Sequence, residues 1–155
     1  RVQTVLNQLG SHQLPSFLME VQTYGPWFEA FAFEQLQLGR SRLNRGVLNA
    51  TILNPSFDHF RLWEYLFNSS SGSVRTSLMP HLANVGTDKA FCLIESQTNH
   101  ELRFVSRRAY VWIASFKRHP RTRAVLLKGM ESQYRGVRLE CQRQLQLRRD
   151  EGFDR

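Results

Sequence analysis

The stretch that decides the predicted fold is Arg108–Lys117, which reads RAYVWIASFK. In an extended chain its aromatic side chains share one face with a single alanine: Tyr110, Trp112, Ala114 and Phe116. The opposite face carries the remaining small and aliphatic side chains: Ala109, Val111, Ile113 and Ser115. Alternation of this kind is typical of a strand in a sheet, so we predict a β-strand over this stretch.

Two shorter apolar runs precede it and predict further strands. Ala90–Glu95 and Leu102–Ser106 flank the polar segment Gln97–His100, which has the composition of a hairpin loop. The three strands together predict a small antiparallel sheet in the second half of the chain.

The first half is predicted to mix strands and helices. Alternation indicates a strand over Phe17–Tyr24, and a second strand is expected at Val47–Leu53. Pro26 is suited to open a helix that runs to about Leu38. Ser56 is a candidate N-cap for a further helix, with aromatic residues behind it at helical spacing. The sequence therefore predicts an α+β fold in which helices pack against the sheet.

A long basic amphipathic helix is predicted at the C-terminal end, over residues 121–149. Its apolar residues recur every three or four positions: Leu127, Met130, Tyr134, Val137, Cys141 and Leu145. Such a helix would be about 40 Å long, enough to project onto a partner. Gly129 and Gly136 weaken it and indicate either a break or a close approach of another backbone. No internal repeat is visible, and residues 1–155 are predicted to form one domain.

The positive charge is confined to the last third of the chain. Residues 1–100 carry seven basic and seven acidic side chains, whereas residues 101–155 carry fourteen basic and six acidic ones. The basic residues are 18 Arg and 3 Lys, and the guanidinium group is suited to bidentate contacts with phosphate. A charge excess localised in this way predicts one cationic face and a polyanionic partner.

The candidate nucleic-acid-binding residues lie around the basic segment 117–123 and the elements on either side of it. They are Arg103, Arg107, Arg108, Lys117, Arg118, Arg121, Arg123, Lys128 and Arg135. Tyr110, Trp112 and Phe116 have two alternative roles: they stack on unpaired bases if their side of the sheet is open, and they belong to the core if the C-terminal helix covers them.

We therefore predict a non-enzymatic RNA-binding protein, a component or accessory factor of a ribonucleoprotein assembly. RNA is expected rather than DNA, with protein partners bound through the C-terminal helix. The alternative is a structural subunit whose basic helix binds an acidic protein surface. The missing initiator Met, the many arginines and the few acids of the tail are typical of an imported organellar protein, such as a mitochondrial one.

One stretch is similar to the coenzyme-A-binding segment of the GNAT acetyltransferases. Residues 124–131 would be an apolar strand, and Gln133 and Gly136 match two positions of the [RQ]xxGx[GA] loop that follows it in that family. Arg138 stands where the family has Gly or Ala. The resemblance implies a fragment of an acetyltransferase as a second alternative.

The sequence predicts no catalytic residue, no metal site and no cofactor. The histidines are scattered, and HExxH, GxxxxGK[ST], GxGxxG and GxSxG are all absent. Cys92 and Cys141 lie far apart outside any CxxC pattern, so both are predicted to be buried or inert thiols. No apolar run is long enough to span a membrane.

Overall fold

The computed structural model describes residues 13, 16–18, 20, 26–37, 41–53 and 59–154. Within these residues the secondary structure is helical throughout, and no strand is found. The predicted α+β fold with its antiparallel sheet is therefore wrong. None of the helices in the described ranges is both long and apolar enough to cross a membrane.

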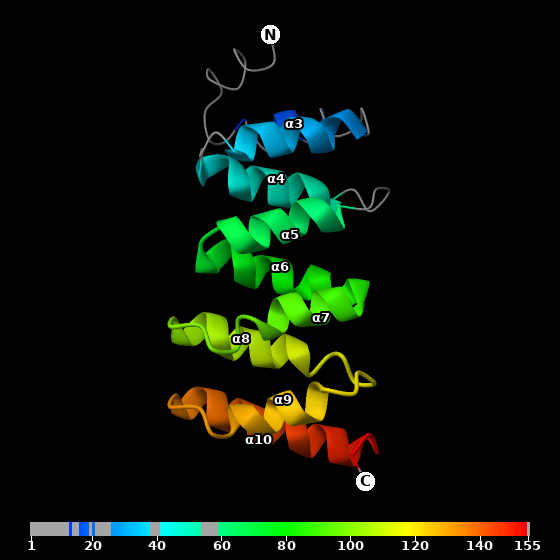
Figure 1. Ribbon diagram of the computed structural model, residues 1–155, viewed down its shortest axis with the longest axis vertical. Coiled ribbons are helices and arrows are strands. Elements are labelled where there is room, and N and C mark those ends of the chain that lie inside the picture. Colours follow the sequence, from blue (N-terminus) through cyan, green and yellow to red (C-terminus); the bar gives the residue numbers. More distant parts are fainter. Residues whose placement is uncertain are drawn as a thin grey trace. The chain divides into compact units, whose positions relative to one another are not determined.

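The chain divides into two compact units, with the boundary between Val74 and Arg75. The helices described before the boundary are α3 (Pro26–Gln37), α4 (Ser41–Leu53) and α5 (Phe60–Ser69). Helix α6 (Gly72–Val85) runs across the boundary and is followed by four more: α7 (Asp88–Glu95), α8 (Arg103–Ile113), α9 (Thr122–Gly129) and α10 (Arg135–Asp150) (Figure 1).

In the first unit the expected helix from Pro26 is confirmed as α3, but the strand expected at Val47–Leu53 is helix α4. Val47, Ala50 and Thr51 are buried at the three- and four-residue spacing of a helix. The Thr51 hydroxyl donates to the Leu48 carbonyl at 2.9 Å and accepts from Trp63 Nε1 at 2.8 Å, which ties α4 to α5.

Two other predictions for this unit fall largely outside the described residues. Of the strand expected at Phe17–Tyr24, residues 16–18 and Glu20 are described, and they are helical. Ser56, the expected N-cap, lies outside the described residues, and His59 occupies the N-cap position of α5 without a side-chain cap.

In the second unit all three predicted strands are helices. The stretch 90–95 forms α7, whose N-cap Thr87 accepts a hydrogen bond from the Ala90 amide at 3.2 Å. The stretches 102–106 and 108–117 both contribute to α8. Gln97–His100 is indeed a turn, but it joins two helices. The strand prediction failed because residues 109–114 are apolar at every position, so periods of two and of 3.6 residues fit them equally well.

The predicted 29-residue C-terminal helix is two helices, α9 and α10, separated by a turn over residues 130–134. Val137, Cys141 and Leu145 of the predicted stripe are buried, as expected. Leu127 and Met130 are instead exposed, because α9 buries the face that carries Val125, Leu126 and Gly129, and Met130 lies in the turn after it. Cys141 is a buried thiol whose pKa burial raises to about 12, whereas Cys92 is exposed, so burial is confirmed for Cys141 alone of the two.

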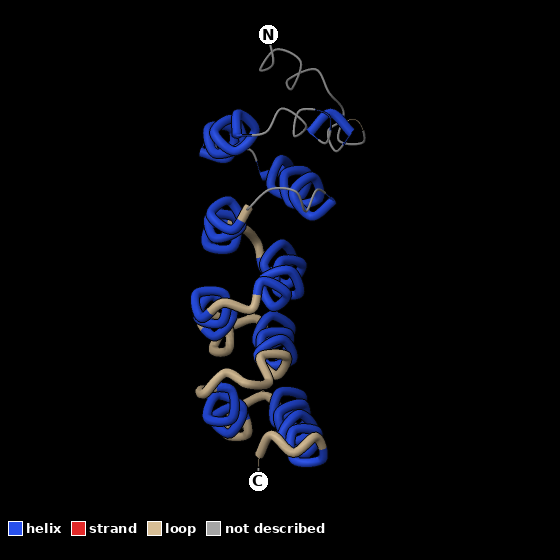
Figure 2. Tube along the Cα trace, turned by 90° about the vertical axis from the view of Figure 1, so that its right-hand side faces the viewer, coloured by secondary structure: helices blue, strands red, loops and turns tan. Residues whose placement is uncertain are grey.

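The helices of the second unit form two layers, with α6, α8 and α10 in one and α7 and α9 in the other (Figure 2). The buried positions repeat from helix to helix within the first layer. Leu78, Ala109 and Cys141 are equivalent buried residues of α6, α8 and α10, spaced 31 and 32 residues apart, and Leu82, Ile113 and Leu145 follow one turn later. The repeat is thus one of burial register rather than of residue identity, which is why it is not visible in the sequence.

At Gly129 the backbone of α9 lies close against side chains of α8 and α10. A Cβ atom at this position would lie 2.6 and 2.9 Å from Cε1 and Cζ of Tyr110, and closer still to the sulfur of Cys141. The sequence-based expectation that the glycines mark a break or a close approach is confirmed at Gly129, which is the last residue of α9.

Gly129→Ala is expected to lower the free energy of unfolding by about 1–3 kcal/mol, because the added methyl group overpacks the contact with Tyr110 and Cys141. Gly136→Ala is the matched control: nothing lies within 4 Å of its Cβ position, so the substitution should raise stability by up to about 1 kcal/mol. Urea unfolding followed by circular dichroism measures both. Equal stabilisation by the two substitutions would exclude the close approach at Gly129.

Candidate nucleic-acid interface

The nine predicted cations are all exposed, but they do not form one cluster. Arg103 is the first residue of α8, and Arg135 is the first residue of α10. Lys128 lies in the last turn of α9. Lys117, Arg118, Arg121 and Arg123 lie beyond the opposite end of α8, and Arg107 and Arg108 lie within it. With 11 residues, α8 separates the two ends by about 16 Å.

Most cations of the 117–123 segment are paired with carboxylates. Lys117 Nζ lies 2.7 Å from Glu151, Arg121 Nη1 lies 3.0 Å from Glu95, and Arg123 Nε lies 3.9 Å from Asp154. Arg118 has no such partner among the described residues. This segment therefore offers less uncompensated charge than its sequence suggests.

Contacts with α7 hold the same segment in place. The His119 ring stacks on Phe91 with centroids 3.7 Å apart, and the Arg121 guanidinium lies over the same ring at 5.1 Å. His119 Nε2 lies 2.8 Å from Asp88 Oδ1, and this hydrogen bond is the main cause of a lowered pKa at Asp88. Arg121 also donates to Cys92 Sγ at 3.0 Å. These contacts give His119 and Arg121 a structural role.

Asp154 fastens the end of α10 to the same region. The buried Arg148 donates to both Asp154 oxygens, at 3.0 and 2.9 Å, and to the Lys117 carbonyl at 2.9 Å. The hydrogen bond from Arg148 is the main cause of a lowered pKa at Asp154. The region thus holds a compact ion-pair network that joins α10 to the chain after α8.

A groove of about 600 Å³ crosses the layer formed by α6, α8 and α10. Its residues from α8 are Phe104, Arg107, Arg108 and Val111, spaced so that they share one face of the helix. Thr76 of α6 and Glu140, Arg143 and Gln144 of α10 complete the lining.

The groove carries three guanidinium groups and one carboxylate. Glu140 is buried and lies 3.3 Å from Arg107 Nη2 and 3.9 Å from Arg143 Nη1. Gln144 Nε2 donates to the other side of the same carboxylate at 2.9 Å. Arg108 has no carboxylate partner among the described residues. A formal excess of two positive charges therefore faces the groove.

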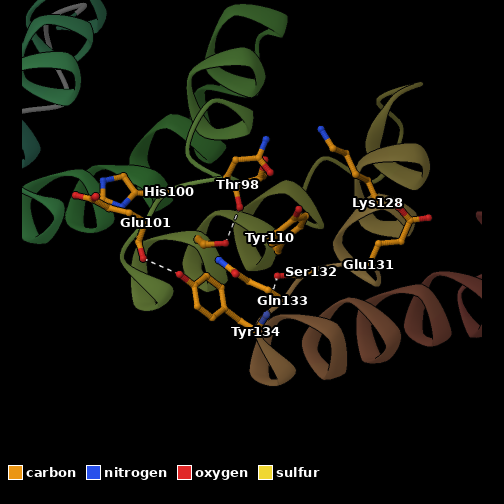
Figure 3. A pocket seen from close by; sticks show the side chains of 11 residues that line it. Thr98, His100, Glu101, Tyr110, Lys128, Glu131, Ser132, Gln133 and Tyr134 are labelled. Atoms are coloured by element: carbon orange, nitrogen blue, oxygen red, sulfur yellow. Dashed lines mark hydrogen bonds between the residues drawn. The ribbon is translucent and has the colours of Figure 1, made fainter.

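A second hollow, of about 360 Å³, lies between the α7–α8 turn and the α9–α10 turn (Figure 3). Lys128 is its one Lys or Arg residue, and Glu101 and Glu131 accompany it together with His100. Tyr134 donates its hydroxyl proton to the Glu101 carbonyl at 2.8 Å. With more acid than base around it, this hollow is a poor site for a phosphate.

Of the aromatic residues proposed as a stacking platform, Tyr110 and Phe116 are buried and Trp112 is partly buried. The structure therefore assigns Tyr110 and Phe116 to the core. Phe104, in the first turn of α8, is an aromatic side chain that is exposed (51%), and it lines the groove.

Phe104 and Arg143 were not among the residues predicted from the sequence, and the reason is the wrong period. On a strand Arg107 and Arg108 point to opposite sides, whereas on a helix they join Phe104 and Val111 on one face. Helical spacing applied to residues 104–111 would have found this set.

The acetyltransferase resemblance is also contradicted at the level of fold. The strand it requires over residues 124–131 is occupied by α9 and the turn that follows, and α9 is a helix.

Asp154→Asn is expected to lower the free energy of unfolding by about 1–3 kcal/mol at neutral pH, because it replaces the charged partner of a buried Arg148. Since the folded-state pKa of Asp154 is lowered, the contribution of this pair is full above the ordinary carboxyl pKa and is lost as the pH falls through the lowered value. Urea unfolding at neutral and acidic pH should show the two proteins converging in acid. Asp150→Asn, at the exposed last residue of α10, should change stability little at either pH.

Comparison with known proteins gives no relative: no family model, no curated protein and no solved structure matches the chain.

Proposed function

We propose that this protein binds RNA without catalysing a reaction, as a component or accessory factor of a ribonucleoprotein assembly, and that its phosphate contacts come from the groove on α6, α8 and α10. The single observation that carries the proposal is the charge imbalance of this groove, where Arg107, Arg108 and Arg143 surround only one carboxylate.

Physical chemistry favours a phosphate chain as the partner of such a groove. Each phosphate neutralised by an arginine releases condensed counterions, which makes association favourable at low salt. A guanidinium group binds a phosphate through two parallel hydrogen bonds. Arg108 needs to break no ion pair with another described residue in order to do so.

The layered arrangement of the second unit supports the same function. Proteins built from stacked helix pairs present one helix of each pair on a common surface, and several RNA-binding modules use such a surface. Here the groove draws side chains from three successive helices of one layer.

A second candidate function is a structural subunit that binds a protein partner. It is favoured by two exposed apolar residues two turns apart on α10, Leu139 at 53% and Leu147 at 41% exposure. A complex that survives nuclease treatment and is lost in the Leu139→Ser, Leu147→Ser variant would support it.

Arg108→Gln combined with Arg143→Gln should weaken RNA binding and flatten its salt dependence. For a single strand, each lost phosphate contact is expected to reduce the steepness of the plot of log K against log [salt] by about 0.7, so each of the two substitutions should contribute that amount if its arginine contacts a phosphate. The matched control is Arg118→Gln with Arg123→Gln, which removes the same charge from the 117–123 segment. Fluorescence anisotropy with a labelled RNA at several salt concentrations measures both.

The two charge variants separate the possible outcomes. A larger loss of affinity in the groove variant supports the groove, whereas an equal loss in both variants contradicts it. Binding by the unaltered protein that is weak and independent of salt would contradict RNA binding itself.

Glu140→Gln should tighten RNA binding by roughly two- to tenfold at low salt, because it removes the carboxylate that competes with phosphate for Arg107 and Arg143. The amide keeps an oxygen that can accept from Arg107, so circular dichroism should show an unchanged helix content. Weaker binding by a folded Glu140→Gln protein would mean that the carboxylate positions the arginines for the ligand.

A further inference from the structure

Phe104 differs from most phenylalanines of the described chain in lying exposed without a partner. Phe28, Phe31, Phe67, Phe91 and Phe116 are buried. Phe153 is also exposed, but Lys117 and Arg148 lie over its ring at 5.7 and 5.8 Å. For Phe104 the structure gives no ring or cation contact within the described residues. An exposed aromatic ring in a cationic groove is complementary to a ligand that combines a flat ring with negative charge.

From this juxtaposition, and resting on the proposed function, we infer that the groove binds an unpaired nucleotide of single-stranded RNA, with its base stacked on Phe104 and its phosphates held by the neighbouring arginines. Arg107 and Arg108 follow Phe104 by one turn of α8, so ring and cations are immediate neighbours on one helix face. The volume of about 600 Å³ falls within the range of pockets that take small organic ligands.

The pairing of ring and cations selects single strands over duplexes. In a duplex the faces of the bases are stacked on one another and are inaccessible to a side chain, whereas an unpaired base offers its face to an aromatic ring. An acidic protein surface would satisfy the arginines but would leave the ring of Phe104 without a flat partner.

The groove is further expected to tolerate different bases. Stacking discriminates little, since every base has a π-face. Gln144 could read a base edge, but its amide nitrogen already donates to Glu140. We therefore expect the base to be held by stacking on Phe104 rather than by contacts with its edge.

The test compares Phe104→Leu with Phe104→Trp in the full chain, using a single-stranded oligoadenylate and an RNA duplex of the same length as probes. Phe104→Leu should weaken single-strand binding by roughly 5- to 100-fold, whereas Phe104→Trp, which keeps an aromatic ring, should bind single strands about as tightly as the unaltered protein. Neither substitution should change the salt slope or the affinity for the duplex, because the arginines remain. Circular dichroism of both variants checks folding, which an exposed position should not disturb.

The outcomes also separate this inference from the proposed function. Salt-dependent RNA binding that is equal in all three proteins, or an equal loss of affinity for single strands and duplex, overturns the stacking role and leaves RNA binding in place. Absence of salt-dependent binding in the unaltered protein overturns both. Disruption of a nuclease-resistant protein complex by Phe104→Leu, with RNA binding unchanged, would assign the ring to a protein partner instead.

Discussion

The approach of α9 to α8 and α10 at Gly129 is the contact on which the rest of the second unit depends. A side chain at this position would collide with Tyr110 and Cys141, so only glycine lets the three helices meet at this distance. Tyr110 and Cys141 are themselves buried residues of α8 and α10. Because the three helices close on one another here, the opposite faces of α8 and α10 are held side by side, and these faces form the groove.

Glu140 links this packing to the charge of the groove. Its carboxylate is buried, and a buried carboxylate is tolerated only when it is paired and hydrogen-bonded. Arg107 from α8 and Arg143 and Gln144 from α10 meet that requirement. The same contacts hold Arg107 and Arg143 beside a carboxylate, so an anion that binds these two guanidinium groups must compete with Glu140. One acidic side chain thus joins α8 to α10 while leaving the groove with an excess of positive charge.

The sequence predicted which part of the chain is basic, but not which basic side chains pair with carboxylates or which of them line the groove. Helix α3 was predicted from Pro26, which suits the first position of a helix. The close approach at Gly129 was predicted from the cost of glycine within a helix. The strand prediction at residues 108–117 was wrong because residues 109–114 are all apolar, so that a strand period of two residues and a helix period of 3.6 residues fit equally well. The buried face of residues 109–114 is determined by packing against α9 and α10, and these contacts between distant parts of the chain cannot be read from local sequence spacing. With the wrong period Phe104 was separated from Arg107, and the groove could not be found.

The distribution of ion pairs shows why a count of arginines does not locate a binding surface. The segment 117–123 has the highest density of positive charge in the chain, yet Lys117, Arg121 and Arg123 each lie beside a carboxylate, and Arg121 also packs on an aromatic ring. The groove has fewer cations but only one acid among them. Since a phosphate must compete with whatever carboxylate already holds a guanidinium, the uncompensated charge, rather than the total, determines where an anion binds. By that measure the groove on α6, α8 and α10 is the stronger candidate for an anion, although the sequence predicted the segment 117–123.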